Sequence, residues 1–351
     1  MPNHPFAFHL RRAGLLSLFA ATLLPACKPD KKADPAPTAP VVTKSVYVVN
    51  EGSVNGAISF YNKESKAVNR DVFEARNGRK LGPYVQSMTI VGSKAYLVVN
   101  GANQVEVVNL ADFAAGAPIT GLSQPRYLLA VSGTKAYLTE WLGAFPDYER
   151  GRVSVIDLTT NTITKRLRVG VNPEQLLFTE NRVYVANSYG TNLTVIDPAT
   201  DTVVDSVAVP AGPKNLVRDD AGNIWVLCSR YGSAKDHLVR FNPASPTINT
   251  DIEFANDYTN GNLRATATGN KVYAVVNGAL YPIRPYTSSL PAEPLIRRGF
   301  YGLGIDPQDG TIYAGTSPSF TTEGYTVRYT AAGALIDSFQ VAVGPNSYLF
   351  Y

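Results

Sequence analysis

Residues 171–212 read VNPEQLLFTENRVYVANSYGTNLTVIDPATDTVVDSVAVPAG and decide the fold. The stretch holds four short apolar or alternating runs, each about as long as a β-strand. The runs are residues 175–178, 182–186, 193–196 and 202–209. Turn-forming pairs separate them at Glu180-Asn181, Tyr189-Gly190 and Asp197-Pro198. The stretch therefore predicts a four-stranded antiparallel meander, which cannot bury its own faces and needs similar neighbours.

Further copies of this unit run through the chain. A polar residue followed by an aromatic residue within an apolar run recurs at Tyr47, Tyr96, Tyr137, Tyr184, Trp225, Tyr273 and Tyr313. Successive aromatics are 49, 41, 47, 41, 48 and 40 residues apart. This spacing is close to the ~40–45 residues of a four-stranded propeller blade. We therefore predict an all-β chain folded as a seven-bladed β-propeller.

The two ends of the repeat array complement each other. Each blade is expected to open with an innermost strand led by Pro or Gly, and proline suits the first residue of a strand because its missing N–H is not needed there. The last such segment, residues 344–351, has no blade after it, whereas the first blade begins at its second strand, residues 45–49. We expect the C-terminal strand to complete the first blade and to close the ring.

The N-terminus does not fit the repeat. Arg11 and Arg12 precede an apolar run over residues 13–24 that is short for a membrane span, and small residues lead from it to Cys27. This pattern resembles a bacterial lipoprotein signal. It implies a signal peptide over residues 1–26 and an acylated Cys27; an ordinary signal peptide with an incidental cysteine is the alternative.

A tether and a single domain follow this signal. Residues 27–44 are rich in Pro, Ala and Lys, which predicts an extended, unfolded segment. The propeller then occupies residues 45–351. We expect the protein to be lipid-anchored in the outer membrane and to face the cell surface. Cys228 is left without a partner for a disulfide, and its apolar surroundings predict that it is buried.

Composition excludes several function classes. The formal net charge of +4 comes from the predicted signal and tether, so the propeller itself is close to neutral and no nucleic-acid partner is expected. His237 is the only histidine outside the predicted signal peptide. A multi-histidine metal site is therefore excluded, and a Ser-His-Asp triad is disfavoured. The chain has no glycine-rich phosphate loop.

The loops at one end of the predicted axis carry the candidate ligand site, because propellers concentrate function there. These loops combine large aromatic residues with cations, and exposed aromatics cost solubility unless something covers them. The set is Trp141, Phe145, Tyr148, Tyr189 and Tyr231 with Arg126, Lys214 and Arg230. For any one of these aromatics, packing on a neighbouring blade is the alternative.

Three carboxylates occupy comparable positions and leave a catalytic alternative open. Glu51 and Glu140 follow second strands, and Glu174 lies on a predicted inner strand. Paired carboxylates serve acid–base chemistry or hold divalent metals, but sequence does not give their separation. Glu174 is counted with the ligand-binding residues in our main interpretation.

Two resemblances narrow the interpretation. The segments VYVANSYGTNLTVIDPATDTVV and GRVSVIDLTTNTITKRLRVGVNPEQ resemble the YVTN-type propeller repeat. The segments SVYVVNEG, LGPYVQSM, KAYLVVNGANQVEVV and QPRYLLAVSGTKAYLTEW resemble the BtuG-like cobalamin-capturing surface lipoproteins of Bacteroidetes. That resemblance implies a corrinoid gripped on one propeller face and presented to a TonB-dependent outer-membrane transporter. By position it marks Asn50, Glu51, Tyr84, Gln86, Arg126 and Trp141 as ligand-face candidates.

The expected function is therefore non-enzymatic capture of a bulky small molecule, with cobalamin as the specific hypothesis. No catalytic residue, resident cofactor or metal ligand is predicted under it. Two alternatives stay open: a lyase-like or lactonase-like propeller enzyme with a carboxylate-bound metal, and a structural or adhesive surface protein.

Overall fold

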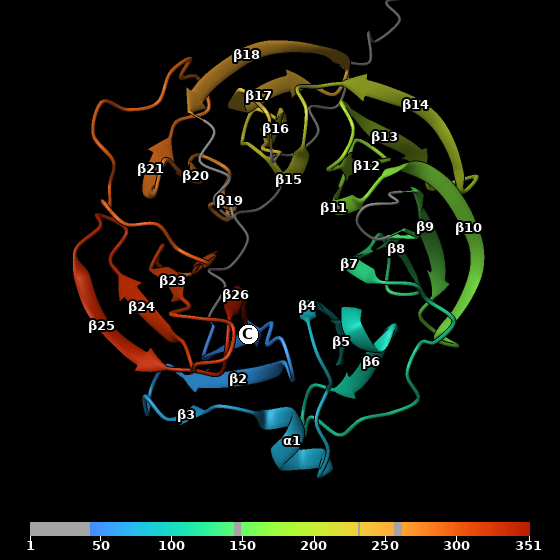
Figure 1. Ribbon diagram of the computed structural model, residues 1–351, viewed down its shortest axis with the longest axis vertical. Helices are drawn as coiled ribbons and strands as arrows, with labels where there is room; N and C mark the ends of the chain where they lie inside the picture. Colours follow the sequence, from blue (N-terminus) through green and yellow to red (C-terminus); the bar gives the residue numbers. More distant parts are fainter. Residues whose placement is uncertain (1–42, 144–148, 231, 256–261) are drawn as a thin grey trace, which may run out of the picture. The chain divides into compact units, whose positions relative to one another are not determined.

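Seven small antiparallel sheets stand around a common axis in the computed structural model, which describes residues 43–143, 149–230, 232–255 and 262–351 (Figure 1). The predicted seven-bladed β-propeller is confirmed. Chain contacts divide the protein between Ala39 and Pro40, so all described residues belong to one unit. The predicted signal peptide, Cys27 and almost the whole predicted tether lie outside the described residues.

Each blade runs outward from an inner strand that lines the axis. The inner strands are β4 (Val85–Val91), β7 (Pro125–Ala130), β11 (Pro173–Thr179), β15 (Pro213–Arg218), β19 (Asn262–Ala265), β22 (Gly302–Ile305) and β26 (Pro345–Phe350). The second strands are β1 (Ser45–Asn50), β5 (Lys94–Val99), β8 (Lys135–Glu140), β12 (Arg182–Asn187), β16 (Ile224–Cys228), β20 (Val272–Val276) and β23 (Ile312–Thr316).

The outer half of each blade is more variable. The third strands are β2 (Ala57–Asn62), β6 (Gln104–Asn109), β9 (Arg150–Asp157), β13 (Asn192–Asp197), β17 (Lys235–Asn242), β21 (Ala279–Ile283) and β24 (Tyr325–Tyr329). The outermost strands are β3 (Val68–Asn69), β10 (Thr162–Val171), β14 (Thr202–Ala208), β18 (Ser245–Ala255) and β25 (Leu335–Gln340). The longer outer strands form the rim of the ring in Figure 1.

Two blades differ from the predicted four-stranded unit. The sheets β4-β5-β6 and β19-β20-β21 have three strands each. In the second of these, residues 284–295 carry three prolines and reach the sheet edge only through an isolated bridge between Leu280 and Ile296. Proline cannot donate to a strand ladder, which explains the missing fourth strand. The other blade has Gly116 and Pro118 in the same place, and it too makes only isolated bridges there.

Helical structure is sparse among the described residues. The α-helix α1 (Val72–Asn77) is capped by Asp71, whose carboxylate accepts from the N–H groups of Phe73 and Glu74, and a 3₁₀ turn, η1, spans Asn100–Ala102. In the described parts of the chain, no helix combines the length and apolar character that a bilayer span needs.

The hydrophobic core lies between blades rather than at the axis. All seven repeat aromatics lie on second strands, and none is more than 5% exposed. Tyr96, for example, packs with Leu128 and Leu138 of the next blade. Cys228 is a fully buried free thiol, as predicted, and burial raises its pKa well above its usual value. Each blade therefore covers the faces of its neighbours, which explains why the repeats occur together.

The C-terminal strand closes the ring as predicted. Strand β26 pairs antiparallel with β1 in the sheet order β26-β1-β2-β3, with Val46 opposite Phe350 and Val48 opposite Tyr348. A second link joins the first and last blades at the fully buried side chain of Asp306. Its carboxylate accepts hydrogen bonds from Lys63 Nζ at 2.6 Å and Thr43 Oγ1 at 3.1 Å.

Close packing of β26 on the last blade gives a testable prediction. A Cβ atom at Gly315 would lie 2.2 Å from the carbonyl oxygen of Pro345, so the two backbones could not keep their present contact. We expect Gly315→Ala to lower the free energy of unfolding by about 1–3 kcal/mol, the usual cost of overpacking. Chemical denaturation measures this effect.

Gly133→Ala is the matched control, because nothing lies within 4 Å of a Cβ atom at Gly133. That variant should melt like the parent protein. Equal stability of the two variants would contradict the tight contact between β23 and β26.

Candidate functional site

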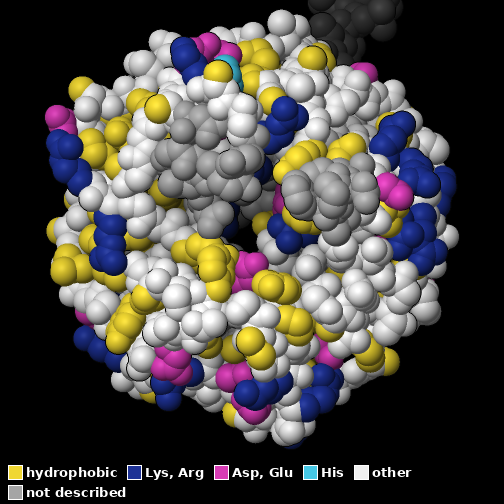
Figure 2. Space-filling model, in the orientation of Figure 1, with side chains coloured by type: hydrophobic (Ala, Val, Ile, Leu, Met, Phe, Trp, Pro, Cys, Tyr) yellow, Lys and Arg dark blue, Asp and Glu magenta, His cyan; other side chains and the backbone are white. Residues whose placement is uncertain are grey.

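A cavity of about 280 Å³ opens on the axis at one end of the ring. Its walls come from the first residues of the inner strands and from loops that join second to third strands, such as Ser188 and Tyr189 after β12. These are the two kinds of segment that the sequence indicated. Figure 2 views this ring along the direction of Figure 1 and shows it hollowed at the centre, with basic and acidic side chains beside the hollow.

The structure brings eight of the eleven predicted ligand residues together in this axial pocket. They are Glu51, Gln86, Arg126, Trp141, Glu174, Tyr189, Lys214 and Arg230. Their role as ligand residues stays a prediction, but their convergence does not depend on it. Tyr231, Phe145 and Tyr148 lie outside the described residues.

Asn50, one of the ligand-face candidates, does not line the axial pocket. Its side chain is fully buried, and Nδ2 donates to the carbonyl oxygens of Val48 and Ala57 and to Ser59 Oγ. Asn187, at the same position of the fourth blade, bridges its own hairpin in a similar way through Nδ2 and Thr194 Oγ1. An asparagine at the end of a second strand therefore supports the hairpin behind it.

Tyr84 also does not line the pocket. It precedes β4 with a φ of 57°, and its side chain is 41% exposed. Its backbone N–H donates to Gly52 and its carbonyl accepts from Asn100, so the backbone rather than the ring holds this turn together.

Two inner strands are joined by an ion pair inside the pocket. Arg126 of β7 binds Glu174 of β11 through Nη2 to Oε1 at 2.9 Å and Nε to Oε2 at 3.2 Å. The indole of Trp141 stacks on this guanidinium, with Cζ 4.2 Å from the ring centroid, and donates from Nε1 to the carbonyl of Pro173. Burial raises the pKa of Glu174, and the charge of Arg126 offsets part of the rise. The cation is thus fixed in direction before any ligand arrives.

Two tyrosines that the sequence analysis did not single out form hydrogen bonds with polar side chains of the pocket. Tyr301 donates to the carboxylate of Glu51, and burial together with this carboxylate raises the tyrosine pKa. Gln86 Nε2 donates to Tyr127 Oη at 3.0 Å. Burial and the charge of Glu174 raise the pKa of Tyr127 to about 12, so both phenols stay neutral at physiological pH.

Arg264 is the third residue missed by the sequence analysis. It lies on β19, where Nε donates to the carbonyl of Leu303 and Nη1 to the carbonyl of Leu263. Burial lowers its pKa. The sequence analysis also left out Asn262, Asn346 and Ser347, which lie near the starts of inner strands and line the pocket.

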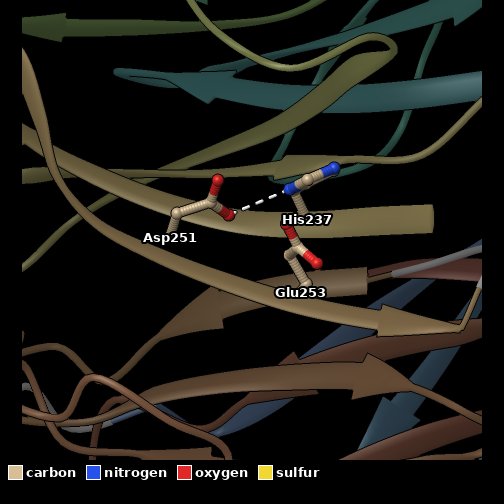
Figure 3. A group of neighbouring side chains, drawn as sticks. All are labelled: His237, Asp251 and Glu253. Carbon is tan, nitrogen blue, oxygen red and sulfur yellow. Dashed lines mark hydrogen bonds and ion pairs between the residues drawn. The ribbon is translucent and has the colours of Figure 1, made fainter.

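Among the described residues, the axial carboxylates Glu51 and Glu174 belong to no group of three His, Cys, Asp or Glu side chains that could hold a metal ion together. The one such group that the described residues contain is His237, Asp251 and Glu253, on the outer strands β17 and β18 (Figure 3). His237 Nδ1 lies 2.9 Å from Asp251 Oδ1, and Glu253 forms an ion pair with Lys235. Rim ion pairing accounts for this group.

Fold and pocket together define a β-propeller with a polar, charge-lined axial site. The family profile described as "Domain of unknown function (DUF5074)" matches residues 44–346. The chain belongs to this family. No curated protein matches it by sequence.

Solved structures share the fold at low sequence identity. A quinonprotein alcohol dehydrogenase-like protein from Bacteroides thetaiotaomicron is 16% identical, with a TM-score of 0.66 over 88% of this chain and 78% of that chain. Hydrazine synthase of Kuenenia stuttgartiensis is 17% identical, with a TM-score of 0.60 over 76% of this chain and 91% of that chain. The dihydro-heme d1 dehydrogenase NirN is 12% identical, with a TM-score of 0.56 over 90% of this chain and 77% of that chain. These likenesses concern the fold alone.

Proposed function

We propose that this protein is a non-enzymatic capture protein that binds a bulky small molecule over its axial pocket. The observation that carries the proposal is the Arg126 guanidinium, which is fixed by Glu174 and covered by Trp141 in the wall of a polar cavity. A rigid ring that holds its polar groups in place loses little conformational entropy when a ligand binds. Such a site suits recognition by hydrogen bonding and stacking.

The contacts of the two axial carboxylates support a binding role over a catalytic one. Glu174 is engaged by Arg126, and Glu51 accepts from Tyr301. A general base needs a carboxylate that is available to the substrate, and a metal needs several such ligands. Both carboxylates already have partners in the protein, which favours a structural role for them in a binding site.

The ligand that we favour is a corrinoid such as cobalamin, on the resemblance of the first three blades to BtuG-like lipoproteins. A corrin ring is larger than the cavity of about 280 Å³, so it would lie across the mouth and insert only a side group. The peripheral amides of cobalamin match donors and acceptors such as Gln86, Asn215 and Arg126, which line the pocket.

The proposed cellular setting follows from the N-terminal sequence. A lipid on Cys27 would hold the protein in the outer membrane, and the tether of residues 27–44 would let the ring reach a partner. That partner would be a TonB-dependent transporter that accepts the captured ligand.

Calorimetric titration with cyanocobalamin tests the proposed function. We expect one-to-one binding that Trp141→Ala weakens by about tenfold or more, because an aromatic stacked on a buried cation is the kind of residue that dominates a recognition surface. Trp141→Phe should lie between the two, because it keeps a ring over Arg126 but loses the hydrogen bond to Pro173.

Tyr286→Ala is the control, because it removes an aromatic that is 77% exposed and does not line the pocket. It should bind like the parent protein. No binding by the parent protein would refute the corrinoid assignment, and equal binding by the parent protein and the Trp141→Ala variant would refute the location.

A further inference from the structure

The six charged residues of the axial pocket do not balance. Arg126, Lys214, Arg230 and Arg264 line it together with only two carboxylates, Glu51 and Glu174. Glu174 pairs with Arg126, and the described lining residues together carry four cations against two carboxylates. An excess of positive charge around a cavity attracts negative groups.

Arg264 differs from Arg126 in its partners. Within the described residues, its guanidinium donates to two main-chain carbonyl oxygens, those of Leu303 and Leu263. Within the described part of the chain, Arg264 forms no ion pair, and Nη2 has no hydrogen-bond partner. A partly buried guanidinium without a counter-ion is costly for the folded state, because desolvation is not offset by an opposite charge.

Arg264 is held in a fixed position in the pocket by its two hydrogen bonds. The carbonyls of Leu303 and Leu263 hold Nε and Nη1, so the guanidinium cannot swing away to solvent without losing both bonds. Two uncharged acceptors of the same pocket, Gln86 Oε1 and Asn215 Oδ1, are buried without a partner among the described residues. The site thus offers a positioned cation beside acceptors that a hydroxyl or amide N–H could fill.

We propose that Arg264 binds an anionic group of the captured ligand, a phosphate or a carboxylate, inside the axial pocket. The inference deepens the proposed function and rests on the axial pocket being the ligand site. It adds that the captured ligand carries a negative charge. The oxyanion supplies the counter-ion that Arg264 lacks among the described residues.

Inorganic phosphate and acetate are the probes, because they separate the two oxyanion classes. At constant ionic strength adjusted with chloride, one or both should raise the melting temperature of the protein, since a ligand that binds only the folded state stabilises it. Arg264→Met should lose this stabilisation, whereas Arg264→Lys should keep part of it, because it retains the charge without the fork geometry.

Arg182→Met is the control, because Arg182 is a partly exposed cation at the β11–β12 hairpin outside the pocket. It should respond to the anions like the parent protein. Circular dichroism of each variant shows whether the ring is folded. A full response in folded Arg264→Met, or no response of the parent protein to either anion, would overturn the inference.

The cyanocobalamin titration separates this inference from the proposed function. If the protein binds cyanocobalamin but neither anion raises its melting temperature, the anion site is refuted and the capture role is supported. If the anions stabilise the protein through Arg264 but cyanocobalamin does not bind, the anion site is supported and the corrinoid assignment is refuted.

Discussion

Removing residues 344–351 is expected to abolish cooperative folding of the ring or to lower its free energy of unfolding by more than about 4 kcal/mol. The deletion takes away β26, and with it the ladder along β1 and the buried ring of Tyr348 that packs against Tyr313. It also exposes the edge of β1 and uncovers the part of the last blade that packs against β26. Thermal melting followed by circular dichroism measures the loss.

A circular permutant is the control for this deletion. Tyr351 and Ser45 exchange backbone hydrogen bonds, so a short turn can join the two termini and the chain can be reopened before Gly344. This permutant contains every residue of the ring and should fold with a stability close to that of the parent. A truncated protein that melts like the parent would contradict closure by β26, because the other described strands would then suffice.

The second large effect is expected at the buried ion pair of the pocket. Arg126→Met leaves the carboxylate of Glu174, whose side chain is 11% exposed, without its counter-ion. Removing one partner of a buried pair typically costs about 3–5 kcal/mol. The double variant Arg126→Met with Glu174→Met removes both charges and should recover most of this loss, as denaturant titrations of the three proteins would show.

The pH dependence of the Arg126→Met variant gives an independent check. Burial already raises the pKa of Glu174 in the folded protein, and loss of Arg126 raises it further. The folded state then takes up a proton before the unfolded state does, so acidification through the folded pKa should reduce the destabilisation. A stability deficit that stays constant across this acid range would show that lost packing, rather than the unpaired carboxylate, causes it.

The fold was predictable because its determinants are local and repeated. The aromatic of each second strand and the Pro-led inner strands recur at blade spacing. The first blade lacks an inner strand and the C-terminal end has one to spare, which leaves one way to close the ring. The missing fourth strands were harder to predict, because a repeated pattern leads one to expect four strands in every blade. The prolines of residues 284–295 were the available signal.

The candidate site was predictable only in part. Residues on Pro-led inner strands and on hairpin loops, such as Arg126 and Tyr189, were found because the repeat gives their position along the axis. Asn50 lies inside its hairpin and does not line the pocket, because a residue at the end of a second strand can point either into the hairpin or toward the axis, and sequence does not distinguish the two. Arg264 and Tyr301 were missed because their blades depart most from the consensus segment, and because pairing between inner strands is a contact over long sequence distance.

Hydrogen exchange of the protein with and without cyanocobalamin tests the central claim most directly, because it reports both binding and its location. The account predicts slower exchange, confined to the starts of the inner strands and to the loops at Ser188-Tyr189 and Ser229-Arg230. Unchanged exchange, or protection concentrated at the opposite hairpins such as Glu180-Asn181, would contradict capture at the axial pocket.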